Sequence, residues 1–188
     1  SVVIAEQTFD SGTASWQTST SGTPTYNTTG GHDGGAHISF VGNIATNTAA
    51  FGSALVEFRC QTTGCIDDNS GLFGDWFAKD VTSISYWFKH DSATDIEAYL
   101  RVAPVSGVGG AGSALTGILM FPDTWYQITV PLDASAWDPS FGGGNYNNIF
   151  AAVGKLQPGI FFEFGTVYNE TGVTFSLDDV QLNAVPIP

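Results

Sequence analysis

The chain has 188 residues, of which 43% are hydrophobic and 12% are charged, so it can bury a core and is unlike a disordered sequence. Eighteen acidic residues against five Lys and Arg give a net charge of −13, which excludes nucleic acid as a partner because phosphate binding needs clustered basic residues. No run of about 18 apolar residues occurs, so we expect no transmembrane segment in this chain.

Strand signals recur along the chain, whereas no stretch has the apolar spacing that is typical of a helix. Residues 1–5 are mostly apolar, and we expect them to form a first strand that follows a removed secretion signal. Eight further segments are rich in β-branched and aromatic residues and are predicted as strands: 36–41, 54–59, 83–89, 96–103, 115–121, 126–132, 159–164 and 173–182.

Apolar and polar residues alternate in the segments 96–103 and 126–132, which predicts that each of these strands buries one face. We expect long loops at 11–35, 61–78, 104–114 and 134–148. About nine antiparallel strands separated by such loops predict an all-β fold, a β-sandwich of the jelly-roll, galactose-binding-like type. We expect a single domain over residues 1–183, with residues 184–188 as a tail.

Two cysteines lie close together, with Gln, Thr, Thr and Gly between Cys60 and Cys65. A zinc site would need further ligands, and no second Cys or His pair is nearby. We therefore predict a disulfide-closed loop, which implies an oxidising compartment and a secreted protein.

The sequence contains no HExxH, GxSxG, P-loop or strand-linked GxGxxG motif, and His32, His37 and His90 have no suitably spaced partner. We therefore expect no enzymatic activity. Acidic residues are plentiful, so a polysaccharide hydrolase with a carboxylate pair stays open as an alternative.

Adjacent carboxylates, Asp178 and Asp179, lie near the end of the last predicted strand. Burying them is costly unless a cation neutralises them, and calcium accepts carboxylate and carbonyl oxygens. Residues 6–10 and the glycine-rich turn 30–35 offer further oxygens. The alternative is that these carboxylates are simply solvated at a sheet edge.

Aromatic side chains on polar strand faces and in loops are candidates for sugar contacts, because sugar rings lie against aromatic faces while polar groups hold the hydroxyls. Glu97, Tyr99 and Arg101 share one face of one predicted strand. The full predicted ligand-binding set is Glu97, Tyr99, Arg101, Trp125, Gln127, Trp137, Asn145 and Tyr146. The alternative is that most of the five Trp belong to the core or anchor loops.

The opening segment 6–12 with Trp16, together with the closing Leu-Asp-Asp-Val-Gln-Leu at 177–182, resembles the jelly-roll carbohydrate-binding modules, especially those of family 4. The resemblance covers the two chain ends and implies a structural calcium bound by a first-strand carbonyl, a glycine carbonyl and the first Asp of the closing pair. With acids from the same segments, the implied ligand set is Glu6, Thr8, Asp33, Gly34, Gly35 and Asp178.

The tail Val185-Pro186-Ile187-Pro188 resembles the Val-Pro-x-Pro signature of PEP-CTERM proteins, which exosortases sort to the bacterial surface. The apolar helix and basic tail of that group do not follow here, and Ile187 replaces the usual Glu. This resemblance implies an extracellular, biofilm-matrix or exopolysaccharide setting.

These observations together predict a non-catalytic extracellular or cell-surface protein whose calcium-stabilised jelly roll contacts polysaccharide. The first alternative is a structural subunit that self-associates into fibres or sheets through its apolar N-terminal strand.

Overall fold

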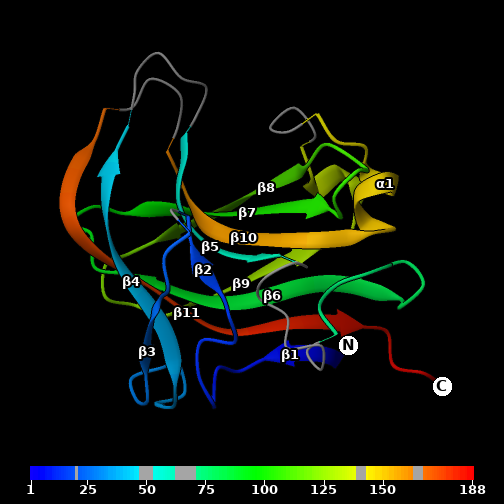
Figure 1. Cartoon of the computed structure of the whole chain (residues 1–188), viewed down its shortest axis with the longest axis horizontal. Coiled ribbons are helices and arrows are strands. Elements are labelled where there is room, and N and C mark those ends of the chain that lie inside the picture. The colour runs from blue at the N-terminus through cyan, green and yellow to red at the C-terminus, as the bar shows by residue number, and fades with distance from the viewer. Residues whose placement is uncertain (20, 47–52, 62–70, 139–142, 163–166) are drawn as a thin grey trace.

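In the computed structural model the chain folds into two antiparallel sheets packed face to face (Figure 1). The structure describes residues 1–19, 21–46, 53–61, 71–138, 143–162 and 167–188. The first sheet, here called the β11 sheet, runs in the order β3 (Thr25–Asn27), β4 (His37–Ala45), β11 (Asn169–Ala184), β6 (Val81–His90) and β9 (Tyr126–Pro131), with β1 (Val2–Gln7) also paired to β11. The second, the β10 sheet, runs in the order β2 (Gln17–Thr18), β5 (Ser53–Gln61), β10 (Val153–Phe162), β7 (Ile96–Pro104) and β8 (Gly112–Met120). The predicted all-β sandwich is confirmed.

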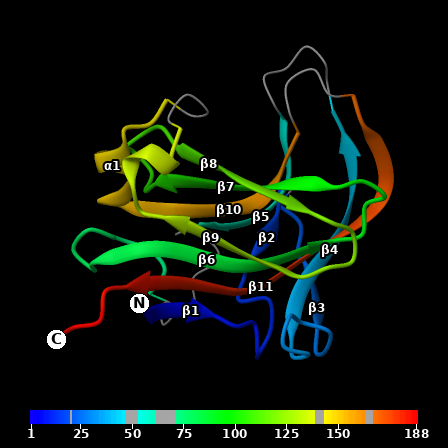
Figure 2. The same ribbon diagram turned by 180° about the vertical axis from the view of Figure 1, so that it is seen from behind.

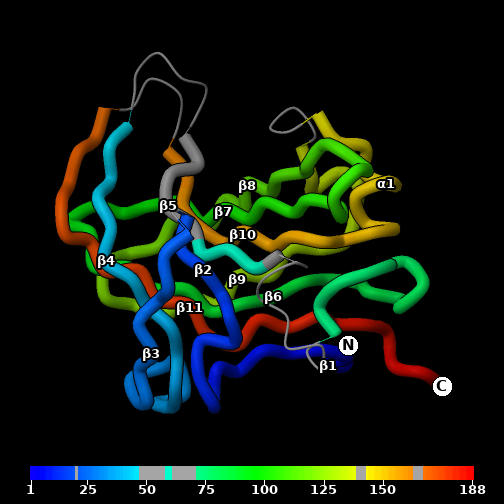
Figure 3. Tube along the Cα trace, in the orientation of Figure 1, coloured from blue at the N-terminus to red at the C-terminus, as the bar shows by residue number. Residues whose placement is uncertain are grey.

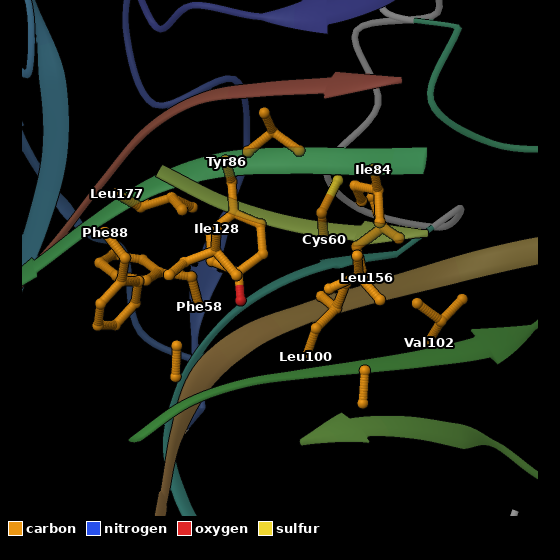
Figure 4. Close-up of a cluster of buried hydrophobic side chains, with 14 of the residues drawn as sticks. Phe58, Cys60, Ile84, Tyr86, Phe88, Leu100, Val102, Ile128, Leu156 and Leu177 are labelled. Carbon is orange, nitrogen blue, oxygen red and sulfur yellow. The ribbon is translucent and has the colours of Figure 1, made fainter. Parts of the chain in front are cut away.

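Alternating apolar residues from both sheets meet in one core (Figure 4). Ile84, Tyr86 and Phe88 of β6 point inward and alternate with Ser85, Trp87 and Lys89, as the period of two requires. Each fully buried side chain of this size stabilises the fold by about 1.5–3 kcal/mol. The Tyr86 hydroxyl donates to the Tyr99 carbonyl at 3.1 Å and so joins the sheets, and burial raises the pKa of this phenol.

Each predicted strand corresponds to an observed strand, but several boundaries differ. The strand predicted from residue 159 begins earlier, at Val153. The prediction starts too late because Pro158 and Gly159 are typical of a strand boundary, whereas here they lie within β10, next to a register shift at Gly159/Phe161. The final strand is longer than predicted and bends at a bulge between Asp178 and Gln181.

Short elements occupy segments that were predicted as loops. The strands β2 and β3 lie in the predicted loop 11–35, and a 3₁₀ helix (Ala134–Ala136) and α1 (Tyr146–Phe150) lie in the predicted loop 134–148. Each is five residues or shorter, too short to show a period in sequence.

The two chain ends lie side by side, as the tube in Figure 3 shows. β1 is antiparallel to β11, with Val2 opposite Ala184 and Gln7 opposite Val180. β11 thus extends one residue into the predicted tail. Seen from behind, the chain crosses from the β10 sheet to the β11 sheet where β8 leads into β9 (Figure 2).

The predicted disulfide stays a prediction. Cys60 is buried on β5 and belongs to the core, whereas Cys65 lies outside the described residues, as does the acidic stretch 67–69. Within the described part of the chain, no helix has the length and apolar character needed to cross a membrane.

Candidate functional site

The face of the β10 sheet that is turned away from the core carries a row of polar side chains, and we call it the outer β10 face. Gln157 of β10 pairs with Arg101 of β7, and Arg101 pairs with Ser113 of β8. The Arg101 guanidinium donates to the Gln157 side-chain oxygen. Arg59 of β5 donates to Ser21 Oγ at 2.6 Å, and its buried Nε has no partner among the described residues. The row therefore presents two guanidinium groups on strands at either side of one amide.

An aromatic pair lies beside this row on the same face. The rings of Tyr99 and Phe161 stack with centroids 6.0 Å apart and planes 17° apart. The Tyr99 hydroxyl is hydrogen-bonded to Ser113 Oγ at 2.6 Å. On the edge strand β8, Leu115 and Leu119 are 42% and 52% exposed and add an aliphatic border. Tyr99 and Phe161 are only 2% and 6% exposed, so the apolar surface of the outer β10 face comes from the two leucines.

Two hollows border the outer β10 face. One, of about 290 Å³, lies where β7 begins and is lined by Asp95, Glu97, Leu119 and Phe161, among others. The other, of about 370 Å³, lies between β8 and the 3₁₀ helix and includes Ser113, Leu115 and Trp137. In Figure 1, α1 stands at one end of this sheet and the ends of β4 and β11 stand at the other. The surface is therefore uneven along the direction of the strands.

The structure divides the predicted ligand-binding residues among three places. Glu97, Tyr99 and Arg101 share the outer β10 face, as the alternation predicts, and the Glu97 carboxylate accepts from the Gly117 amide at 3.0 Å. Trp125 and Gln127 lie on the other sheet, at β9.

The remaining predicted residues do not join either face. Trp137 is buried, packs against Phe150 and donates to the Pro131 carbonyl at 3.0 Å, so it anchors its loop. Asn145 caps α1 and Tyr146 packs on Phe150. The eight predicted residues therefore do not all share one face, because strand register and loop packing decide which side chains meet.

Sequence reasoning missed Arg59, Gln157, Ser113 and Phe161. Only the register between strands brings Gln157, Ser113 and Phe161 beside Arg101 or Tyr99, and brings Arg59 beside Gln157.

A second cluster, the Asp178 corner, comprises Gly31, His32, Gly35, Ala36 and Asp178. A Cβ atom built on Gly31 would lie 2.5 Å from Asp178 Oδ2, 2.9 Å from the Gly35 carbonyl oxygen and 3.0 Å from the Ala36 carbonyl oxygen. Three oxygen atoms therefore converge on one point. Side-chain ligand atoms of His32, Asp33 and Asp178 also lie within 4.8 Å of one another. This donor set, mostly carboxylate and carbonyl oxygen, fits calcium.

Asp178 is only 1% exposed, although it is acidic. Burial, and then the neighbouring Asp179 carboxylate, raise the pKa of Asp178 to about 6. The carboxylate accepts from the backbone amides of His32 at 3.1 Å and Asp179 at 2.8 Å. A bound cation would compensate the remaining cost of burying this charge.

Neighbouring groups hold the Asp178 corner in place. The His32 ring bonds to the Asp179 carboxylate and stacks on Trp87, with centroids 4.3 Å apart and planes 4° apart. Asp179 has a φ of 39°, in the left-handed region, at the bulge of β11. The bulge turns the two adjacent carboxylates toward different partners.

The predicted calcium residues meet in part. Asp33, Gly35 and Asp178 lie together in this corner, and Gly34 is in the same turn, with its carbonyl accepting from the Gly30 amide at 3.2 Å. Thr8 directly follows Gln7, which is paired with Val180, so it lies where the pairing of β1 with β11 ends, two residues from Asp178 on the β11 side.

Glu6 is exposed and accepts from the Gln181 amide group at 3.1 Å. Glu6 therefore bridges the paired strands β1 and β11 and lies outside the Asp178 corner. The sequence indicates the turn 30–35 as a source of oxygens but does not single out Gly31 or His32, and it gives no signal for the Ala36 carbonyl.

No protein-family model matches the chain, and no curated protein is similar to it in sequence. Solved structures do match. The carbohydrate-binding module CtCBM11 is 14% identical, with a TM-score of 0.58 over 98% of both chains. The C-terminal family 22 carbohydrate-binding module of Xyn10B from Clostridium thermocellum is 10% identical, with a TM-score of 0.55 over 97% of this chain and 94% of that one. The agarase AgWH50C is 11% identical, with a TM-score of 0.54 over 97% of this chain and 25% of its own.

At these identities the likeness concerns the fold. The chain has the jelly-roll β-sandwich architecture that carbohydrate-binding modules also have.

Proposed function

We propose that this chain is a non-catalytic extracellular domain that binds an extended polysaccharide along the outer β10 face, on a scaffold stabilised by calcium at the Asp178 corner. The observation that carries the proposal is the row in which the half-buried Arg59 and Arg101 lie on either side of the buried Gln157. The exposed Leu115 and Leu119 lie beside this row and supply its apolar surface. Guanidinium and amide groups hydrogen-bond to sugar hydroxyls, and apolar side chains cover the ring faces.

Structures with the same fold support a binding role. The N-terminal CBM22-1–GH10 modules of Xyn10B from Clostridium thermocellum were solved in complex with xylohexaose, and this chain matches 30% of that one at a TM-score of 0.55 and 14% identity. The cleft of the second family 22 module of Xyn10B is involved in ligand binding. In the xylanase and the agarase the similar region is less than a third of the chain, as expected for a binding module beside a separate catalytic part.

The extracellular setting rests on the predicted disulfide and the Val-Pro-Ile-Pro tail. An acidic surface with few Lys residues resists non-specific association, which suits a protein among matrix polymers. We place the domain at a bacterial surface or in a biofilm matrix that contains its polysaccharide.

Isothermal titration of the intact chain tests the proposal, with xylohexaose and oligosaccharides of agarose and β-glucan as probes and saturating calcium throughout. We expect at least one probe to bind and Arg101→Met to weaken it. The matched control is Lys79→Met, which removes a cation that donates to the Gly71 carbonyl beside β1, outside both proposed sugar sites, and should change nothing. Absence of binding to all probes would reject this function, and release of new reducing ends would favour the hydrolase alternative.

A second candidate function is self-assembly through β1. Val2, Val3 and Ile4 are exposed on this strand, which pairs with β11. Light scattering during size-exclusion chromatography tests this. Assembly that disappears in Val3→Lys would support the candidate, and a strict monomer at high concentration would reject it.

A further inference from the structure

The outer face of the β11 sheet contains a polar hollow of about 220 Å³, away from the outer β10 face. It lies over β3, β4, β11 and β6, and its lining includes Asn27, His37, Ser39, Lys89, Thr174 and Ser176. Three of these side chains are nearly inaccessible although they are polar: His37, Ser39 and Ser176 are 7%, 8% and 3% exposed. Buried polar groups normally have hydrogen-bond partners, so each deserves an account.

His37 is the buried side chain whose hydrogen-bonding capacity is not fully used. Its Nδ1 is buried and has no hydrogen-bond partner in the described part of the chain. The ring bonds to the Thr29 carbonyl, which leaves Nε2 as the donor and Nδ1 as a lone-pair acceptor. Burial, and then the Lys89 cation, lower the pKa of His37, which agrees with a neutral ring. Because His37 lines the hollow, a ligand hydroxyl that reached Nδ1 would supply the missing hydrogen-bond donor.

The side chains around His37 are held in place by contacts with one another. Ser39 Oγ accepts from the Asn27 amide at 2.9 Å. Lys89 stands 5.0 Å from the centre of the Trp125 ring, and His37 meets the edge of the same ring at 5.5 Å between centroids. Trp125 in turn donates to the Gly30 carbonyl at 3.2 Å. The tryptophan therefore holds the cation and the imidazole beside one another.

The charges around the hollow favour a neutral ligand. Lys89 inside it disfavours a metal ion, whereas Asp91 and Asp123 line it as well and disfavour an anion. The set of donors and acceptors matches vicinal hydroxyls, which both donate and accept. The volume is below that of sites for drug-sized ligands, so it suits one sugar ring and not a chain.

We propose that this hollow binds a single neutral sugar residue, with His37 Nδ1 accepting a hydrogen bond from one sugar hydroxyl and Lys89 donating a hydrogen bond to a second sugar oxygen. This site is separate from the proposed polysaccharide surface and lies on the opposite sheet. The long Lys89 side chain can rotate to admit the ligand.

The test is a nitrogen-detected NMR titration of the labelled full chain with D-glucose, D-galactose, D-xylose and D-mannose, each up to tens of millimolar. Saturating calcium is present throughout, so that the Asp178 corner stays constant. Sodium acetate serves as the anion control. The readouts are the amides of Asn27, Ser39, Thr174 and Ser176 and the ring nitrogens of His37.

We expect at least one sugar to shift these amides and His37 Nδ1, with no effect of acetate. Lys89→Met should weaken that binding by about tenfold or more, since a hydrogen bond to a charged donor is lost. Ser176→Ala, which removes one hydroxyl and adds no volume, should weaken it less, and Arg101→Met should not change it. No shift with any of the four sugars, equal shifts with acetate, or undiminished binding in Lys89→Met would overturn the proposal. Loss of polysaccharide binding in Arg101→Met with these shifts intact would show that the two sites are independent.

Discussion

The Asp178 corner and the outer β10 face differ in how they are built. The corner joins parts of the chain that lie far apart: the His32 amide donates to Asp178 across 146 residues of sequence, and β1 runs beside the same stretch of β11. Asp178 and Gly31 are buried there, and backbone atoms supply much of the oxygen. The outer β10 face instead consists of side chains that project from adjacent strands, such as Arg101 and Gln157.

This difference separates stability from recognition. A substitution at the Asp178 corner weakens the contacts between the turn 30–35 and β11, so it should lower the free energy of unfolding. A change on the outer face leaves the paired backbone intact and should act on ligand affinity. Each prediction below tests whether the two regions divide in this way.

Removing calcium should have the largest effect. An ion that binds only the folded chain stabilises it by mass action, so chelation should lower Tm by about 5–15 °C. Asp178→Ala should lower Tm and abolish the response to calcium, whereas Asp33→Asn at the exposed side of the corner should reduce the response only in part. Differential scanning calorimetry with and without chelator measures both. An identical Tm in calcium and chelator would show that the corner holds no ion.

Gly31→Ala should destabilise the fold by about 1–3 kcal/mol, because the added Cβ meets the Asp178 carboxylate and two carbonyl oxygens. The matched control is Gly35→Ala, whose Cβ meets only the Asp33 side chain, with its nearest oxygen at 2.9 Å. That side chain can rotate away, so we expect a smaller loss in a urea unfolding experiment. Equal losses in both variants would mean that the three oxygens at Gly31 are not specially crowded.

Arg101→Met should weaken oligosaccharide binding by about tenfold or more and change Tm very little. The substitution removes the guanidinium donor that is proposed to bind a sugar hydroxyl, and it retains the aliphatic part of the side chain. Titration calorimetry and thermal unfolding on one protein preparation give both quantities. A large drop in Tm with unchanged affinity would reverse the division between the two regions.

The pH dependence of metal-depleted protein should give the smallest effect. The pKa of Asp178 is raised from 3.8 to about 6, so its protonated form is favoured in the folded state. This contribution is fully present below about pH 4 and is lost as the pH rises through about 6. His37 acts in the opposite sense, because burial lowers its pKa.

The comparison with Asp178→Asn therefore isolates the Asp178 contribution. Between about pH 5 and 7, Tm of the metal-depleted wild type should fall relative to that of the variant, and calcium should remove the fall. A constant difference between the two proteins would contradict the shifted pKa.

The sequence predicts the corner better than the face, for physical reasons. Asp178 lies in a strand rich in apolar residues that must be buried, and the turn around Gly34 and Gly35 supplies nearby backbone oxygens, so a local pattern is enough. The importance of Gly31 is invisible in sequence, because it depends on the close approach of three oxygens from two segments.

On the outer face, alternation within β7 predicts that Tyr99 and Arg101 point the same way. It cannot predict that Gln157 lies opposite Arg101, since that depends on the register between strands more than fifty residues apart, where Pro158 and Gly159 interrupt the strand signal. Trp137 shows the converse: an aromatic residue in a predicted loop is buried because it fills space beside Phe150.

Methyl NMR of the intact, calcium-loaded chain tests the central claim most directly. Leu115 and Leu119 are exposed on the outer β10 face, whereas Val41 is exposed on β4 of the other sheet. With the oligosaccharide that binds most tightly in calorimetry, the account predicts shifts of the Leu115 and Leu119 methyl groups and an unchanged Val41. Shifts at Val41 with none at the two leucines, or no methyl shift with any oligosaccharide, would contradict it.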